Sequence, residues 1–407
     1  MKRYAIPFVV GLMLISCRPQ PPKSDGGQIV IGTRDSLYSD IMGEQRDIWV
    51  YVPASFSEGK TYPVLYLLDG DGHFYSVMGL IKQLSTTNGN TVVPEMVIVG
   101  IPNTDRLRDL TPTHVGDSTS TSGGGDNFTS FIEKELIPYV DNKYPTTSYR
   151  TMIGHSLGGL MAIDVLISKP ELFDNYVAID PSLWWDNRKI LMEAKLALSQ
   201  QNFDEKSLFV GVANTMPDGM DTTQVVSDTA NNTNHIRSIL DFSKNASSMK
   251  ENNLNFSWSY YDNQDHGSVP LITEHDAMKF LFSWYEAPSW SVILDPELRK
   301  EDLLDLIVGH YDGVSGKFGN KILPPEGKMN NIGYTLMGRG MSEKSYLIFN
   351  LNVENYPESA NVYDSMGDFY VNESDTANAI EFFAKAVELG SLPSKEKLES
   401  MKAPATD

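Results

Sequence analysis

Short apolar runs that alternate with helical patterns are the feature that most limits what this chain can fold into. The runs 63–68 and 96–101 are apolar throughout rather than at every second residue, as expected for strands buried on both faces of a parallel sheet. Strands that alternate with helices predict an α/β fold with a doubly wound, mostly parallel sheet. The other expected strands are 28–33, 46–52, 151–153, 176–179, 208–212 and 256–261, and helical spacing covers 128–139, 160–166, 235–251 and 274–285.

Residues 154–159 read Gly-His-Ser-Leu-Gly-Gly, which places Ser156 in a Gly-x-Ser-x-Gly frame. The frame lies between the apolar run 151–153 and the helical pattern 160–166, so the serine is expected on a sharp turn between a strand and a helix. Glycines two residues to either side leave room for such a strained turn. This arrangement is the nucleophile elbow, and we predict that Ser156 is a catalytic nucleophile.

A serine hydroxyl needs a base to accept its proton and an acidic group to orient that base. In chains with this elbow, the order is serine, acid, histidine. His266 follows the last expected strand and precedes the last expected helix, so we predict it as the base. For the acid, Asp218 in the loop after 208–212 is the first choice, Asp221 in the same loop is the second, and Asp180 after the preceding strand is the third.

Negative charge that develops on a substrate carbonyl needs backbone N–H donors, the oxyanion hole. The amide of Leu157, directly after the nucleophile, is one predicted donor. The second is expected from Gly70 or Asp71, in the loop that follows the strand 63–68, where glycine lets the backbone approach a substrate.

Three further side chains are candidates for substrate binding. Trp184 and Trp185 follow the strand 176–179 at the carboxyl edge of the sheet, where ligands bind in open α/β folds; core packing is the alternative. Arg106 is placed to hold an anionic group, and a structural ion pair with Asp105 or Asp109 is the alternative.

The N-terminus has the pattern of a secretory signal, with Lys2 and Arg3 before the apolar run 4–15. The run ends in Leu-Ile-Ser-Cys and resembles the lipobox of bacterial lipoproteins. We therefore expect residues 1–17 to be a signal peptide with lipidated Cys17, followed by a flexible tether at 18–27. An ordinary signal peptide is the alternative. The resulting prediction is a lipid-anchored protein of the bacterial envelope, on the periplasmic face or the outer-membrane surface.

Composition narrows the possible partners. The formal net charge of −20 argues against nucleic-acid binding and against membrane attachment through surface charge. The seven histidines are scattered and the chain has one cysteine, so no cluster has metal-ligand spacing and we expect neither metal nor cofactor.

The C-terminal quarter repeats with a period of 34 residues. Equivalent pairs are Ile332 and Met366, Gly333 and Gly367, Ser345 and Ala379, and Phe349 and Phe383. This period matches the tetratricopeptide repeat, a helix–turn–helix unit. We predict a helical connector at 289–327, a small all-α domain of two repeats at 328–390 and a tail at 391–407. Two repeats bury too little apolar surface to stand alone, which favours docking on the helical segment at about 296–310, on the preceding domain, on a second subunit or on a protein partner.

Residues 38–285 resemble the Putative esterase family of α/β-hydrolases, which includes esterase D and the enterochelin, feruloyl and acetylxylan esterases. The segments that carry the resemblance are 66–71, 105–113, 131–139, 154–159, 181–186 and 266–270. The resemblance implies an esterase domain at 28–288, with Ser156 and His266 matching the family nucleophile and base. The acid loop departs from the family pattern, and some siderophore esterases use only a Ser–His dyad.

The resemblance further implies a carboxylic ester hydrolase that works through an acyl-enzyme. The expected substrate is a carbohydrate-linked, siderophore or small ester. The alternatives are acyl transfer on the same fold, or a non-catalytic binding lipoprotein that uses the helical repeats. Similar lipoprotein esterases with a tetratricopeptide tail are typical of Bacteroidetes-type bacteria.

Overall fold

The computed structural model describes residues 29–56 and 59–402, and these divide into two compact units. The first unit comprises the described residues up to Asn90 together with Pro94–Leu281, and the second comprises Thr91–Val93 and the described residues from Phe282 onward. The predicted signal peptide, Cys17 and the tether lie outside the described residues. Within the described part of the chain, every helix is too short or too polar to cross a membrane.

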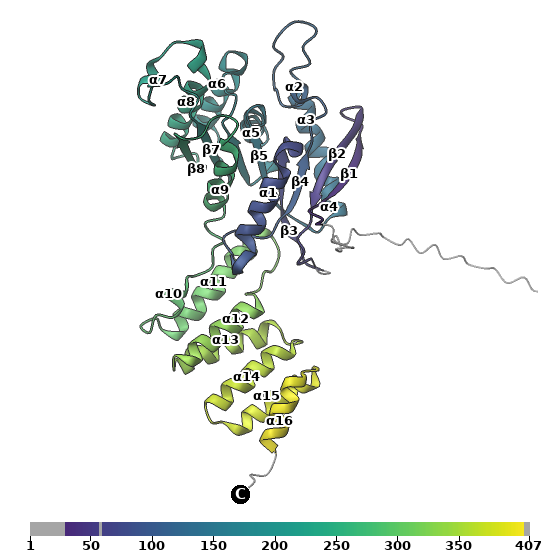
Figure 1. Ribbon diagram of the computed structural model, residues 1–407, viewed down its shortest axis with the longest axis vertical. Coiled ribbons are helices and arrows are strands. Elements are labelled where there is room, and N and C mark those ends of the chain that lie inside the picture. Colours follow the sequence, from purple (N-terminus) through teal and green to yellow (C-terminus); the bar gives the residue numbers. More distant parts are fainter. Residues whose placement is uncertain (1–28, 57–58, 403–407) are drawn as a thin grey trace, which may run out of the picture. The chain divides into compact units, whose positions relative to one another are not determined.

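The first unit is built on an eight-stranded sheet with the order β1-β2-β4-β3-β5-β6-β7-β8 (Figure 1). The five pairs from β4–β3 to β7–β8 in this order are parallel. The pairs β1–β2 and β2–β4 are antiparallel. The strands are β1 Thr33–Ser39, β2 Glu44–Tyr51, β3 Tyr62–Leu68, β4 Val97–Ile101, β5 Thr146–His155, β6 Asn175–Ile179, β7 Ser207–Ala213 and β8 Asn255–Tyr261.

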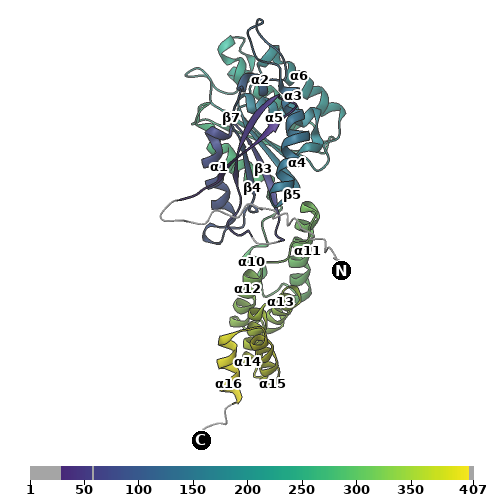
Figure 2. The same ribbon diagram turned by 90° about the vertical axis from the view of Figure 1, so that its right-hand side faces the viewer.

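Helices cover both faces of this sheet, which confirms the α/β-hydrolase prediction (Figures 1 and 2). Helices α1 and α9 contact one another, and α6 packs between α5 and α8. The continuous apolar strands β3 and β4 are buried at every residue, as their composition predicted, and β6 and β7 are buried at every residue as well. The helices are α1 Gly70–Ser85, α2 Arg106–Asp109, α3 Gly125–Phe131, α4 Ile137–Lys143, α5 Leu157–Ser168, α6 Trp185–Gln200, α7 Gln224–Ser227, α8 Asn234–Ser248 and α9 Val269–Leu281.

Two expected boundaries were wrong. The strand expected at 28–33 begins at Thr33, where pairing with Val50 of β2 starts. Ile29 before it is 92% exposed, so its apolar side chain does not meet the core. The last helix of this unit, expected at 274–285, begins earlier at Val269 and ends at Leu281.

The second unit is entirely helical apart from its loops, and it contains two helix pairs in tandem, α12 with α13 and α14 with α15 (Figure 1). The 34-residue period has a physical basis. A Cβ added to Gly333 would lie 2.5 Å from the Phe349 ring, and one added to Gly367 would lie 2.5 Å from the Phe383 ring. The helices are α10 Trp290–Ile293, α11 Lys300–Phe318, α12 Glu326–Gly338, α13 Ser342–Asn355, α14 Ala360–Asn372, α15 Thr376–Glu388 and α16 Leu392–Lys402.

Within the segment expected as a tail, 391–407, residues Leu392–Lys402 form the further helix α16. This helix packs on α15, and its Lys397 pairs with Asp364 and Asp368 of α14. The segment lacks an apolar stripe of clear period, so its helical structure depends on these contacts rather than on pattern.

Candidate active site

Ser156 lies at the turn between β5 and α5, with the strained backbone angles φ 58° and ψ −113°. The turn is tight: a Cβ added to Gly154 would lie 2.1 Å from the carbonyl oxygen of Gly158. Only glycine at position 154 permits this approach. The structure thus has the sharp strand–turn–helix geometry that the motif predicted, and the geometry projects the serine at the carboxyl end of the strand.

Ser182, which the sequence analysis did not single out, contacts the nucleophile candidate. Its hydroxyl lies 3.2 Å from Ser156 Oγ, and its amide donates to the Ser156 carbonyl at 3.0 Å. Ser182 is buried and follows β6 by three residues. It therefore holds the elbow against the end of the neighbouring strand.

His266 pairs with Asp180, the third choice for the acid. His266 Nδ1 lies 2.6 Å from Asp180 Oδ2, and the Ala213 amide donates to Asp180 Oδ1 at 3.0 Å. Asp180 is fully buried directly after β6, with φ 41°. Its own amide donates to the carbonyl of Gly211 on β7 at 2.8 Å, so two strands fix the carboxylate in place.

A second histidine contacts the same carboxylate oxygen. His235, near the start of α8, places Nε2 2.8 Å from Asp180 Oδ2. Burial alone would raise the pKa of Asp180, but hydrogen bonds from His235, His266 and the Ala213 amide hold that pKa well below its usual range. Asp180 is therefore ionised at neutral pH. Both histidines donate to it, which leaves Nε2 of His266 as the acceptor on that ring.

The structure does not bring Asp218 or Asp221 to His266. Asp218 is exposed in the loop after β7. Asp221 Oδ1 instead accepts from the amides of Thr223 and Gln224, which makes it a turn residue. Asp180 rather than Asp218 contacts His266, and the ends of β6 and β7 are neighbours in the sheet, a relation that distance along the chain does not give.

Ser156 and His266 line the same cavity, which has a volume of about 390 Å³. His155 lies beside His266: its Nε2 is 2.8 Å from the His266 main-chain oxygen, and the two rings are 4.5 Å apart. Burial, together with the neighbouring His266 and His73, lowers the pKa of His155 to about 4, so this ring is neutral at pH 7. The complete lining is Asp69, Asp71, Gly72, His73, Asn103, Arg106, His155, Ser156 and His266.

The two predicted oxyanion donors lie in the first turns of helices, where backbone N–H groups lack intrahelical acceptors. Leu157 is the first residue of α5, and Asp71 is the second residue of α1 and lines the cavity. Gly70 is instead packed against β4: a Cβ there would lie 2.5 Å from the Ile101 nitrogen. Asp71 is therefore better placed than Gly70 to face a substrate.

Arg106 lines the cavity but is held by an ion pair. Its guanidinium donates to both carboxylate oxygens of Asp69, at 2.6 and 2.9 Å, and to the His155 carbonyl at 3.2 Å. Asn103 also donates to Asp69, at 2.7 Å. This network fixes the loop before α1, so Arg106 has a structural partner, although not one of those that the sequence suggested.

The tryptophan pair lies outside the cavity lining. Trp185 is buried in the core of the first unit, and its indole N–H donates to the Thr113 carbonyl at 3.2 Å. Trp184 is exposed, with its ring 5.9 Å from that of Trp185. Core packing thus accounts for Trp185.

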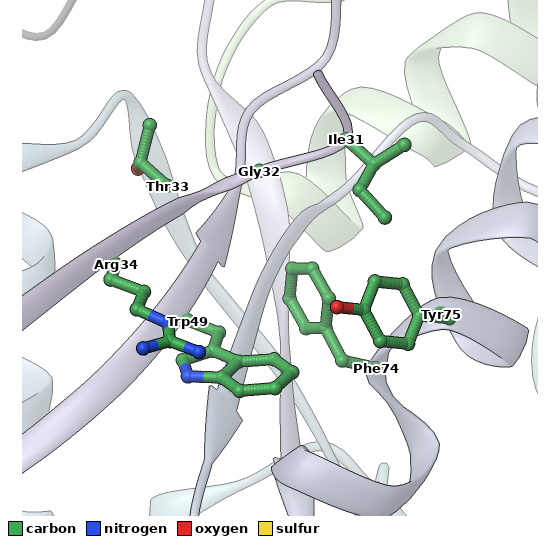
Figure 3. Close-up of a pocket in the computed structure, with 7 residues that line it drawn as sticks. All are labelled: Ile31, Gly32, Thr33, Arg34, Trp49, Phe74 and Tyr75. Atoms are coloured by element: carbon green, nitrogen blue, oxygen red, sulfur yellow. The ribbon is translucent and has the colours of Figure 1, made fainter. Parts of the chain in front are cut away.

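A second hollow, of about 120 Å³, lies between α1 and the strands β1 and β2 (Figure 3). The Arg34 guanidinium lies 5.3 Å from the centre of the Trp49 ring, and Phe74 meets that ring edge-on. The lining residues are Ile31, Gly32, Thr33, Arg34, Trp49, Phe74 and Tyr75. They include no base paired with a nucleophile, so we place the chemistry in the cavity at Ser156.

Asp180, His235 and His266 also form a set with the donor atoms of a metal site. One ligand atom from each lies within 4.8 Å of the others. The sequence analysis expected no metal cluster because these residues are far apart along the chain.

Comparisons with known proteins agree with this fold. Residues 39–269 match the family described as "Putative esterase". The chain is similar to a siderophore enterobactin esterase of Emericella nidulans, with 34% identity over 171 residues, covering 36% of this chain and 56% of that protein. It is also similar to the ferri-bacillibactin esterase BesA of Bacillus subtilis, with 32% identity over 174 residues and coverage of 38% and 60%. The chain thus spans little more than half the length of these relatives.

Solved structures extend the likeness. An IroE-like serine hydrolase from Shewanella oneidensis has a TM-score of 0.65 and 28% identity, and the match covers 79% of this chain and 99% of that one. An uncharacterised protein from Capnocytophaga ochracea has a TM-score of 0.66 at 15% identity, covering 91% and 99%, and shows the same fold. Since the family match spans more than half of the 407 residues, the chain belongs to the Putative esterase family.

Proposed function

We propose that this protein is a serine esterase that hydrolyses carboxylic esters through an acyl-enzyme on Ser156. The observation that carries the proposal is the 2.6 Å contact between His266 Nδ1 and the buried, ionised Asp180. This contact fixes the tautomer in which His266 Nε2 is free to accept a proton, in the cavity that also contains Ser156.

In this mechanism, Ser156 Oγ turns from Ser182 toward His266 and attacks the ester carbonyl while Nε2 takes its proton. The amides of Leu157 and Asp71 donate to the oxyanion, and each donor of this kind is worth about 3–4 kcal/mol. His266 then protonates the leaving alcohol. A water molecule, deprotonated by the same nitrogen, hydrolyses the acyl-enzyme and restores Ser156.

A siderophore ester is the substrate class that we propose first. Support comes from the relatives named as siderophore esterases, including a siderophore triacetylfusarinine C esterase of Aspergillus fumigatus with 30% identity over 165 residues. Carbohydrate-linked and small esters are the competing substrates.

The experiment is a panel of siderophore, feruloyl, acetyl-sugar and p-nitrophenyl esters, with a fluorophosphonate probe in parallel. Wild type should react with the probe and cleave a siderophore ester fastest, whereas Ser156→Ala should do neither. Equal labelling of the two proteins would contradict the nucleophile assignment. Labelling without siderophore cleavage would contradict only the substrate class.

The envelope location remains a proposal that rests on the sequence pattern at Cys17. In the native host, a fatty-acid label should be incorporated into wild type and not into Cys17→Ser, and only wild type should fractionate with membranes. Identical fractionation of both would contradict the lipid anchor. We also retain the proposal that the C-terminal helices are tetratricopeptide-like and take a protein partner or a second subunit.

A further inference from the structure

The second histidine on Asp180 is a feature that ester hydrolysis does not require. One carboxylate oxygen, Oδ2, faces His266 Nδ1 at 2.6 Å and His235 Nε2 at 2.8 Å. The other oxygen is occupied by the Ala213 amide. A triad needs only one of these histidines, so the pair of imidazoles around one oxygen calls for a separate explanation.

We propose that Asp180, His235 and His266 form a zinc-binding site that switches the esterase off. Two imidazole nitrogens and one carboxylate oxygen are a donor set that Zn²⁺ takes, with water in the fourth position. The switching part rests on the proposed function, whereas the binding part does not.

The geometry requires only small movements. Zinc bonds of about 2.0–2.2 Å place neighbouring ligand atoms roughly 3.4 Å apart in a tetrahedral site. The two nitrogen–oxygen contacts, at 2.6 and 2.8 Å, must open by less than an ångström. One ligand atom from each residue already lies within 4.8 Å of the others, so the two histidine nitrogens must approach one another by at most about 1.4 Å.

Burial and charge suit a cation at this point. Asp180 is fully buried, and the Ala213 amide holds its Oδ1, so the carboxylate orientation is fixed before the metal arrives. The side chains of His266 and His235 are 42% and 18% exposed, which gives the ion a route from solvent.

Zinc would inhibit ester hydrolysis because it changes which ring nitrogen of His266 carries the proton. Without metal, His266 carries its proton on Nδ1 and His235 carries its proton on Nε2. Zinc needs the lone pairs of these two atoms, so each proton moves to the other nitrogen of its own ring and none is released from neutral rings. His266 Nε2 then carries a proton, and it cannot accept one from Ser156 until zinc leaves.

The test measures metal binding separately from catalysis, using the full chain after chelator treatment. Titration of the Ser156→Ala variant with Co²⁺ as a zinc substitute should produce the visible absorption of a tetrahedral site. The same variant carrying His235→Gln should bind at least tenfold more weakly, because glutamine keeps a donor to Asp180 but is a poor zinc ligand. His275→Gln is the matched control, since His275 pairs with Asp276 elsewhere on α9, and it should bind Co²⁺ like the parent.

Inhibition is then measured for each protein separately, as its rate of ester hydrolysis with Zn²⁺ divided by its own rate without Zn²⁺. Wild type and His275→Gln should lose most of their activity at micromolar zinc, and His235→Gln should retain its own metal-free rate at that concentration. Equal zinc sensitivity in all three, or no tetrahedral Co²⁺ spectrum in the parent, would overturn the proposal. A Co²⁺ spectrum in a protein that cleaves no ester would contradict the esterase function and leave the metal site standing.

Discussion

Two buried carboxylates near the cavity lie in opposite electrostatic settings. Asp180 accepts three hydrogen bonds and stays ionised. Glu274 on α9 is equally buried, but neither of its oxygens has a hydrogen-bond partner among the described residues, and His73 Nδ1 lies 3.7 Å away. Burial raises the pKa of Glu274 to about 7. We therefore expect replacement of Asp180 to change the proposed catalysis and replacement of Glu274 to change stability.

For Asp180, we expect replacement by asparagine to lower kcat about 10³–10⁴-fold, because an amide that presents its NH₂ favours the wrong tautomer of His266. Asp218→Asn is the matched control and should stay within about twofold of wild type. Steady-state hydrolysis of an activated ester measures both rates. The reverse order would return the acid role to the loop after β7.

For Glu274, we expect a stability effect that depends on pH. Its pKa is raised on folding from 4.5 to about 7, so the folded state binds more protons in that interval and stability falls as pH rises through it. Glu274→Gln lacks this titration. Between about pH 4.5 and 7, the unfolding free energy of Glu274→Gln should rise relative to that of wild type by up to about 3 kcal/mol. Above about pH 7 this difference should stay constant. Urea unfolding at several pH values gives the difference, and a gap that shrinks with rising pH would contradict the account.

At the scale of elements, the helix pairs of the second unit pack through glycines. Gly367 of α14 faces the Phe383 ring so closely that any larger side chain must displace it. We expect Gly367→Ala to destabilise this unit by about 1–3 kcal/mol through overpacking. Gly313→Ala in α11 is the control: a Cβ there meets nothing within 4 Å, so better helix propensity should stabilise by up to about 1 kcal/mol. Thermal unfolding measures both, and equal melting temperatures would refute the packing argument.

Some elements could be predicted from local sequence, and others depend on contacts between distant segments. Strands such as β3 and the elbow at Ser156 were predictable, because apolar composition and a short motif are local signals. The start of β1 was not, since pairing with β2 decides it rather than the hydrophobicity of Ile29. The contact of His266 with Asp180 rather than Asp218 depended on which strand ends are neighbours, and the contact of His235 with Asp180 depended on where α8 begins. Contacts between distant segments were thus the part that the sequence left open.

At the scale of the whole molecule, every residue of the proposed triad belongs to the first unit, which ends at Leu281. Residues 18–290 expressed alone should therefore cleave a small activated ester within about tenfold of the full chain, a loss of at most about 1.4 kcal/mol in transition-state stabilisation. The comparison needs the fluorophosphonate probe as a control for folding. A truncated protein that reacts with the probe but has lost the activity would show that the C-terminal helices take part in turnover.

The backbone of Ser156 has a consequence for how this protein can be engineered. A non-glycine residue with φ 58° and ψ −113° costs of the order of 1–3 kcal/mol, so the proposed nucleophile lies at a position where its replacement by glycine relieves backbone strain. Ser156→Gly should abolish turnover yet raise the unfolding free energy by about 1 kcal/mol, part of the relief being offset by the greater entropy of unfolded glycine. Screens of variant libraries for heat resistance alone would then enrich inactive protein, and selection for a robust catalyst has to score turnover in the same step.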